Sequence, residues 1–127
     1  SAMKLESAAI GGNDVLRLEP QIRSNVIETT PLLSLLFAHR EESEKRDLAH
    51  SVEVYMARSL VELAADHAHR LGVNSVGFSG GVAYNDCITH TMGREALKNG
   101  LDFLTHRVLP AGDGGISLGQ ALVAAVS

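Results

Sequence analysis

Residues 76–86 read VGFSGGVAYND, a short apolar run that is followed by a serine and two adjacent glycines. The apolar residues 75–78 predict a strand, and Gly80-Gly81 predicts a tight turn. Residues 83–99 then predict a helix that ends at Gly100, and residues 101–105 predict a second strand. Strand, helix and strand over about thirty residues indicate a right-handed parallel βαβ unit.

The rest of the chain adds helices and short strands around this unit. Four further helices are predicted from apolar spacing and end signals, over residues 3–9, 31–39, 47–71 and 116–126. Thr30 is the expected N-cap of the second, and Gly72 ends the third. Two more strands are predicted over residues 14–18 and 25–28. The sequence therefore predicts one α/β domain with a small mixed sheet flanked by helices.

Composition excludes several classes of protein. The 127 residues fit a single domain, and the net charge of −4 with a pI near 5.8 argues against nucleic-acid binding. The single cysteine, Cys87, excludes an internal disulfide and a cysteine-based zinc site, and it fits a reducing cytoplasm. No apolar run reaches the roughly 18 residues that span a bilayer, so no membrane association is expected.

Two glycine-rich turns carry the candidate chemistry. Ser79-Gly80-Gly81 follows the first strand of the βαβ unit, and the run GDGG at residues 112–115 follows the second. Because the carboxyl ends of parallel strands share one edge of a sheet, we expect the turns to lie side by side. One turn offers backbone N–H groups to phosphates, and the other offers the Asp113 carboxylate to a metal ion. Glycine turns also serve close packing, so both interpretations stay open.

Other polar residues have ordinary explanations beside functional ones. Asn85 could contact a ribose or phosphate, or it could cap the helix. Cys87 is expected to be a small buried residue rather than a nucleophile. His67 and His69 are two residues apart and point to different sides of a helix, so they are poor joint metal ligands. A structural role is also expected for His50 and His106.

Three segments resemble one known family. SGGVAYN at residues 79–85, HRVLPAGDGGISLGQA at 106–121 and MKLESAA at 3–9 are similar to the carboxyl-terminal part of the HypF family of hydrogenase maturation carbamoyltransferases. The Ala-Tyr pair before Asn85 is similar to the archaeal branch. This resemblance implies one lobe of an actin-like, ribonuclease-H-like ATPase fold. It also implies a reaction in which carbamoyl phosphate and ATP give carbamoyl-adenylate, whose carbamoyl group passes to the carboxyl-terminal cysteine of a maturation partner.

The resemblance also assigns residues to the site. It implies that Ser79, Gly80, Gly81 and Asn85 hold the phosphate and ribose of the nucleotide, that Gly114 and Gly115 shape the metal loop, and that Glu6 lies near the nucleotide. Asp113 would be a metal ligand, with zinc, iron and magnesium all left open. No catalytic residue is assigned.

One departure from the family limits these expectations. The family's metal-binding histidine pair has no counterpart here, and neither do its other modules. We therefore expect residues 1–127 to be the carboxyl-terminal lobe of a larger multidomain protein, inactive alone, with an apolar face through which it could dimerise.

Two alternatives remain beside this interpretation. A PP-loop ATP-binding enzyme also carries SGG after a strand, but there the motif continues to an Asp-Ser pair. A non-catalytic α/β module that docks a partner is the other alternative, and nucleotide protection of the SGGV turn would distinguish it.

Overall fold

The computed structural model describes residues 2–126, in which helices flank two small sheets. The helices are α1 (Ala2–Ala9), α2 (Thr30–His39), α3 (Lys45–Leu71), α4 (Asp86–Lys98) and α5 (Gly114–Val126), with a one-turn 3-10 helix, η1, at Gly81–Tyr84. The strands are β1 (Ile22–Arg23), β2 (Val26–Ile27), β3 (Ser75–Phe78) and β4 (Asp102–Thr105). None of the helices within residues 2–126 is both long and apolar enough to cross a bilayer.

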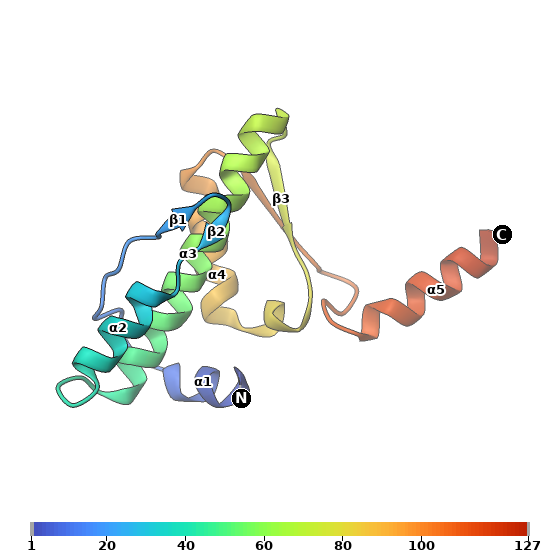
Figure 1. Cartoon of the computed structure of the whole chain (residues 1–127). Coiled ribbons are helices and arrows are strands. Elements are labelled where there is room, and N and C mark those ends of the chain that lie inside the picture. Colours follow the sequence, from blue (N-terminus) through green and yellow to red (C-terminus); the bar gives the residue numbers. More distant parts are fainter. Residues whose placement is uncertain (1, 127) are drawn as a thin grey trace.

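The predicted βαβ unit is present. Strands β3 and β4 pair in parallel with Ser75 opposite Asp102 and Phe78 opposite Thr105, and α4 connects them. The α4 helix packs against α3, which runs through the middle of the molecule (Figure 1). Their shared core is built from small side chains on α3 and larger ones on α4 and its flanks: Ala57, Val61, Ala65, Ala68, Met92, Ala96 and Leu101. These alanines let the two helix backbones come close, which fixes the positions of side chains at both ends of the interface.

The expected strand at residues 14–18 is wrong, because this segment is bonded to a helix instead of a strand. The N–H groups of Val15 and Leu16 donate to the buried hydroxyl of Ser51 on α3, at 3.0 and 3.2 Å. Arg17 has a φ of 46°, in the left-handed region that interrupts a strand. The segment therefore crosses α3 as an irregular connection.

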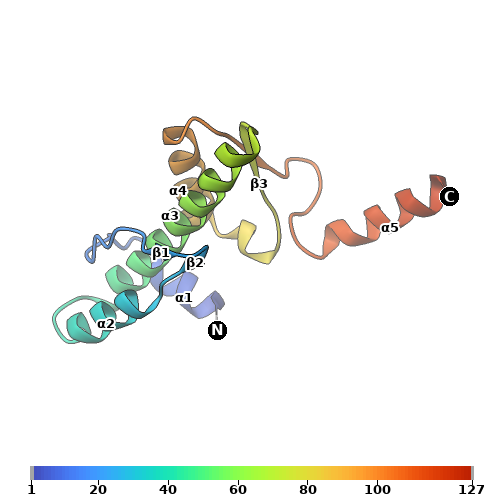
Figure 2. The same cartoon turned by 45° about the horizontal axis from the view of Figure 1, so that its top comes forward.

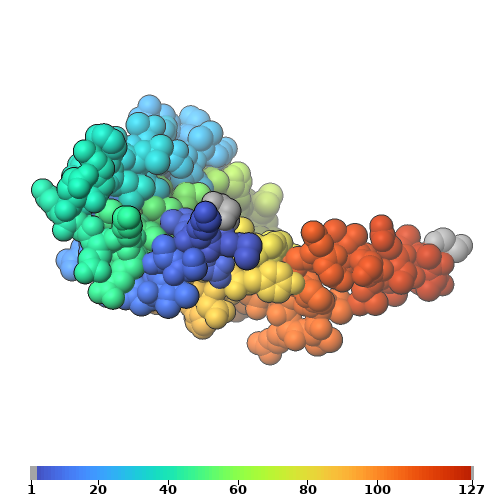
Figure 3. Space-filling view, turned by 90° about the horizontal axis from the view of Figure 1, so that it is seen from below, coloured from blue at the N-terminus to red at the C-terminus, as the bar shows by residue number. Residues whose placement is uncertain are grey.

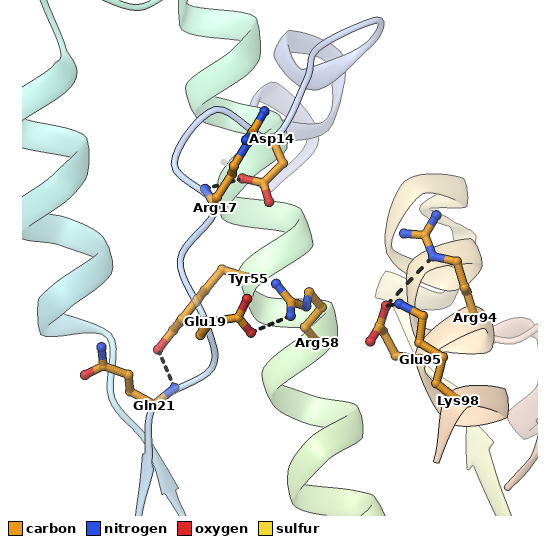
Figure 4. A network of polar contacts seen from close by, with 9 residues as sticks. All are labelled: Asp14, Arg17, Glu19, Gln21, Tyr55, Arg58, Arg94, Glu95 and Lys98. Atoms are coloured by element: carbon orange, nitrogen blue, oxygen red, sulfur yellow. Dashed lines mark hydrogen bonds and ion pairs between the residues drawn. The ribbon is translucent and has the colours of Figure 1, made fainter. Parts of the chain in front are cut away.

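Tyr55 and Arg58 hold the next part of this connection against α3 (Figure 4). The Tyr55 hydroxyl donates to the carbonyl of Glu28 and accepts a long bond from the N–H of Gln21 at 3.4 Å. Arg58 forms an ion pair with Glu19 at 2.6 Å. These contacts position the β1–β2 hairpin along α3.

The second predicted strand, residues 25–28, is present as β2 but covers only Val26–Ile27. It forms a hairpin with β1, which lies outside the predicted strands. Ile22 pairs with Ile27 and Arg23 with Val26, antiparallel, around a two-residue turn. Ser24 and Asn25 have φ angles of 50° and 63°, the pattern of a type I′ turn. The two sheets are thus separate within the described residues, one antiparallel and one parallel.

Several helix starts differ from the sequence prediction, since α3 begins at Lys45 rather than residue 47 and α5 at Gly114 rather than residue 116. The N-cap of α2 is Thr29 rather than Thr30, so Pro31 is the second residue of the helix, whereas the sequence predicts it as the first. The helix expected from residue 83 begins at Asp86, because Asn85 is extended (φ −79°, ψ 110°) and its side chain accepts a bond from the Ile88 N–H. The turn that follows Ser79-Gly80 therefore leads into η1 before α4.

The α5 helix extends away from the rest of the molecule (Figures 1 and 2). Seen from below, it forms an arm beside the body (Figure 3). No described residue of α5 is buried, and its large apolar side chains are exposed: Ile116, Leu118, Leu122, Val123 and Val126. An amphipathic surface helix would bury such residues, so this arm presents an apolar surface.

Candidate functional site

The two glycine-rich turns meet at the carboxyl ends of β3 and β4, as the sequence predicts. The N–H of Gly80 donates to the carbonyl of Ala111 at 2.8 Å, and the hydroxyl of Ser79 donates to the same carbonyl at 3.1 Å. Residues 79–80 are thereby joined to the loop that carries Asp113. This edge is where open α/β sheets bind ligands.

A cavity of about 370 Å³ lies between the two turns. Its lining comes from both: Ser79, Gly80, His106, Leu109, Pro110, Ala111, Gly112, Asp113, Gly115 and Ile116. His106 lies within hydrogen-bond distance of Ser79, with 3.0 Å between Nε2 and Oγ. A structural role was expected for His106, although its position directly after the second predicted strand is the sequence signal that places it at this edge.

Gly80 and Gly81 are glycines for different reasons. Gly80 has φ 108° and ψ 176°, a backbone conformation that side chains disfavour. Gly81 has no such constraint, and a Cβ built on it meets no atom of the described chain within 4 Å. The fold therefore requires glycine at 80 but does not require it at 81.

The start of η1, directly after the cavity-lining Gly80, leaves backbone donors unpaired within the described residues. Ala83 is the first residue of η1 whose N–H is hydrogen-bonded: it donates to the carbonyl of Gly80 at 3.0 Å. Within residues 2–126, no acceptor is found for the N–H groups of Gly81 and Val82. Such unpaired donors beside a glycine suit an anionic ligand.

Packing explains the glycines of the second turn. A Cβ on Gly115 would lie 2.8 Å from the Pro110 carbonyl oxygen, and one on Gly114 would lie 3.1 Å from the Pro110 ring. The N–H of Gly112 donates to the Tyr84 hydroxyl at 3.2 Å. Tyr84 thus attaches η1 to the Asp113 loop, so the two halves of the cavity are held together.

We predict that Tyr84→Phe loosens this loop without unfolding the protein. The variant loses one hydrogen bond at a largely exposed site, which is worth less than about 1 kcal/mol. Amide exchange at Gly112 should therefore quicken by up to about fivefold. Exchange at Gly100, whose N–H bonds to the carbonyl of Leu97, serves as the internal control. Unchanged exchange at Gly112 would show that Tyr84 does not hold the loop.

Asn85 and Glu6 lie away from the glycine-turn cavity. Asn85 is 7% exposed, caps α4 through its side-chain oxygen, and donates from Nδ2 to Glu53 Oε1 at 2.7 Å. The capping alternative is therefore confirmed. Both residues instead line a second cavity, of about 270 Å³, together with Ala9, Ile10, Gly11, His50, Glu53, Asp86 and Cys87. Their predicted contact with a nucleotide stays a prediction.

Cys87 belongs to a polar cluster with His50 and Glu53. Cys87 Sγ lies 3.6 Å from His50 Nδ1, and ligand atoms of all three residues lie within 4.8 Å of one another. Partial burial, together with the hydrogen bond and negative charge of Glu53, raises the pKa of the Cys87 thiol to about 11. Without a metal ion the thiol is therefore protonated and unreactive at neutral pH, as expected for a non-nucleophilic cysteine. This cluster was not among the sites predicted from the sequence.

Asp113 does not make a metal site by itself. Its side chain is exposed at the cavity, and no group of three histidine, cysteine or carboxylate ligands gathers around it within the described residues. One carboxylate replaces too little of a cation's water to hold it. The residues near Asp113 therefore do not fit a complete metal centre.

The remaining predicted histidines take up structural or surface positions. His67 is exposed, and His69 Nε2 lies 3.2 Å from the Asn99 carbonyl, which joins α3 to the end of α4. The expectation that these two residues are poor joint metal ligands stays a prediction.

A family model described as the second subdomain of the Kae1-like domain of carbamoyltransferases matches residues 1–120. Among curated relatives, the probable carbamoyltransferase HypF of Methanocaldococcus jannaschii is 34% identical over 122 residues, which cover 95% of this chain and 16% of that protein. The carbamoyltransferase HypF of Rhodobacter capsulatus is 35% identical over 126 residues, covering 98% and 16%. These similar identities do not distinguish an archaeal from a bacterial origin.

Solved structures agree with the sequence relatives. The crystal structure of T. kodakarensis HypF superposes with a TM-score of 0.82 at 34% identity, over 96% of this chain and 16% of that one. Full-length HypF in its phosphate- and nucleotide-bound form gives 0.76 at 25% identity, over 97% and 17%. The chain thus spans only a small part of the proteins that it resembles.

Proposed function

Because the chain belongs to the HypF carbamoyltransferase family, as the second subdomain of its Kae1-like domain, we propose that it forms one wall of a nucleotide site. The site would lie in a longer carbamoyltransferase, since the chain spans 16% of its curated relatives. On this proposal residues 1–127 act as the carboxyl-terminal lobe and need the rest of the enzyme for activity.

One observation carries the proposal: a glycine at position 81 that the fold does not require, beside the unpaired N–H groups of Gly81 and Val82. Phosphate oxygens satisfy such donors, and the missing side chain lets them come close to the backbone. Ser79 and Gly80 hold this turn against Ala111, so its donors keep a fixed position. A similar solved structure, described as phosphate- and nucleotide-bound, supports a nucleotide as the ligand.

In the proposed reaction, carbamoyl phosphate is hydrolysed to carbamate and phosphate, and the carbamate attacks the α-phosphate of ATP to give carbamoyl-adenylate with release of pyrophosphate. The thiol of a partner protein's cysteine then takes the carbamoyl group, and AMP leaves. In this scheme the Ser79–Val82 turn binds the nucleotide phosphate. Gly114 and Gly115, which the structure places in the first turn of α5 rather than in the predicted loop, follow Asp113 on the opposite wall. Asp113 would supply one ligand of a divalent metal whose other ligands come from outside residues 1–127. Asn85 and Glu6 lie around the second cavity, so a ribose contact by Asn85 would require its side chain to leave Glu53.

The apolar surface of α5 supports a docking role within the same enzyme. Its exposed side chains suit burial against the remaining modules of a longer chain. This docking role is compatible with the proposed nucleotide site. The family assignment leaves the other alternative, a PP-loop ATP-binding enzyme, without support.

The test is ATP consumption by a longer protein that contains this chain. We expect turnover that depends on carbamoyl phosphate, and no turnover by residues 1–127 alone. ATP consumption that is indifferent to carbamoyl phosphate would contradict the proposed reaction. Turnover by the isolated chain would contradict its role as one wall of a shared site.

A further inference from the structure

We propose that His50, Glu53 and Cys87 form a Zn²⁺ site at the interface of α3 and α4, separate from the glycine-turn cavity. The three side chains supply an imidazole nitrogen, a carboxylate oxygen and a thiolate sulfur, and these atoms lie within 4.8 Å of one another. Nitrogen and sulfur donors together favour zinc over magnesium or calcium. The proposal does not depend on a phosphate site at the Ser79–Val82 turn; Asn85 and Glu6, which the resemblance places near the nucleotide, line the same cavity as this cluster.

The spacing of the donors suits a tetrahedral ion. Zinc binds thiolate at about 2.3 Å and imidazole at about 2.0–2.1 Å, so a tetrahedral angle places sulfur and nitrogen about 3.6 Å apart. The measured distance from Cys87 Sγ to His50 Nδ1 is 3.6 Å. The Glu53 carboxylate, at most 4.8 Å from the other two donors, needs only a small movement to complete the set.

Two packed helices hold the donors in place. His50 and Glu53 are three residues apart on α3, which puts both on one face of the helix. Cys87 lies in the first turn of α4, two residues after the cap at Asn85. The alanine-rich core between α3 and α4 fixes the distance between these faces. A site built on two packed helices is well ordered before the ion binds.

Charge gives a second, independent reason for a cation here. Glu53 is only 2% exposed, and no ion pair to it is found in residues 2–126. A buried carboxylate without a cation is costly. The carboxylate and a Cys87 thiolate together carry two negative charges, which Zn²⁺ neutralises. Zinc binding would displace the proton that Cys87 carries in the metal-free protein.

Asn85 orients the carboxylate. Its Nδ2 donates to Glu53 Oε1 at 2.7 Å, which leaves Oε2 for the metal. Outer-shell bonds of this kind orient metal ligands in known sites. This second role explains why Asn85 is buried, since capping α4 alone does not require burial.

The fourth position of the proposed site is open. The cluster faces the cavity of about 270 Å³ that the end of α1 also lines. Glu6 and Asp86 lie on the cavity wall but outside the three-residue cluster. A zinc ion with three protein ligands keeps a water molecule at its fourth position. A small anionic or neutral ligand could replace that water.

Co²⁺ titration of the purified chain tests the proposal, because cobalt replaces zinc and reports its ligands. We expect one equivalent to bind, with a thiolate-to-cobalt charge-transfer band and the visible bands of tetrahedral cobalt, and Zn²⁺ should displace it while Mg²⁺ does not. Cys87→Ser should abolish the charge-transfer band. Glu53→Gln and His50→Gln should each weaken binding by at least about tenfold.

His67→Gln serves as the matched control, because it removes an exposed histidine of the same helix. It should leave both the spectrum and the affinity unchanged. Circular dichroism establishes that each variant is folded, and Cys87→Ser, a near-isosteric change, keeps the test valid if Glu53→Gln unfolds. Absence of Co²⁺ binding, or binding with no charge-transfer band, would overturn the proposal and leave a hydrogen-bonded cluster without metal.

Discussion

Gly81→Val should abolish measurable ATP binding while the protein stays folded. The fold makes no demand for glycine at this position, since a Cβ on Gly81 meets no described atom within 4 Å. In contrast, a valine side chain would occupy the space that phosphate oxygens need beside the N–H groups of Gly81 and Val82. Losing two charge-assisted hydrogen bonds, each worth about 1.5–3 kcal/mol, weakens binding by at least about 100-fold.

Calorimetric titration with ATP and Mg²⁺ measures this effect, with Gly119→Val as the matched control. Gly119 lies on α5, and a Cβ there also meets nothing within 4 Å among the described residues. The control should bind ATP as the unaltered chain does. An unchanged affinity in Gly81→Val would show that the turn serves only packing.

In a longer enzyme that contains this chain, Asp113→Ala should lower the rate of carbamoyl transfer more than about 100-fold. A direct metal ligand should matter more than the outer-shell groups of metal sites, whose loss alone costs about 10–100-fold. The structure gives the carboxylate no other role. No hydrogen bond or ion pair of the Asp113 side chain is found within residues 2–126. The backbone carbonyl of Asp113 accepts a hydrogen bond from the Ile116 N–H at 3.1 Å, and an alanine at this position keeps that carbonyl. Stability should therefore change little.

Asp102→Ala is the matched control for this experiment. Asp102 is an exposed aspartate at the start of β4, the opposite end of the strand that leads toward Asp113. Its variant should retain full transfer activity and the same melting temperature. Normal transfer by Asp113→Ala would remove the metal-ligand role, and unfolding of that variant would show a structural role for the carboxylate.

Local signals predicted the βαβ unit and its edge correctly. The apolar run at 75–78 matches β3, and Gly72 closes α3 with a left-handed φ of 67°. The connection over residues 14–18 could not be predicted, because its backbone is satisfied by Ser51, which lies more than thirty residues away in the chain. Tertiary hydrogen bonds of this kind override strand propensity.

The two candidate sites were predictable to different degrees. The glycine turns lie side by side because parallel strands force it, so their meeting at Ala111 followed from the sequence. The cluster of His50, Glu53 and Cys87 depends on the register between α3 and α4, which side-chain packing decides. The spacing of His50 and Glu53 was its only local signal, and it is common in helices without metal.

The phosphate site at the glycine turns is best tested by following the amide chemical shifts of the ¹⁵N-labelled chain as ATP and Mg²⁺ are added. The nucleotide-wall proposal predicts that the amides of Ser79–Val82 and Asp113–Gly115 shift together and saturate at one ligand concentration. The amides around His67 should not move. Shifts confined to α5, or scattered over the surface without saturation, would contradict a phosphate site at the glycine turns.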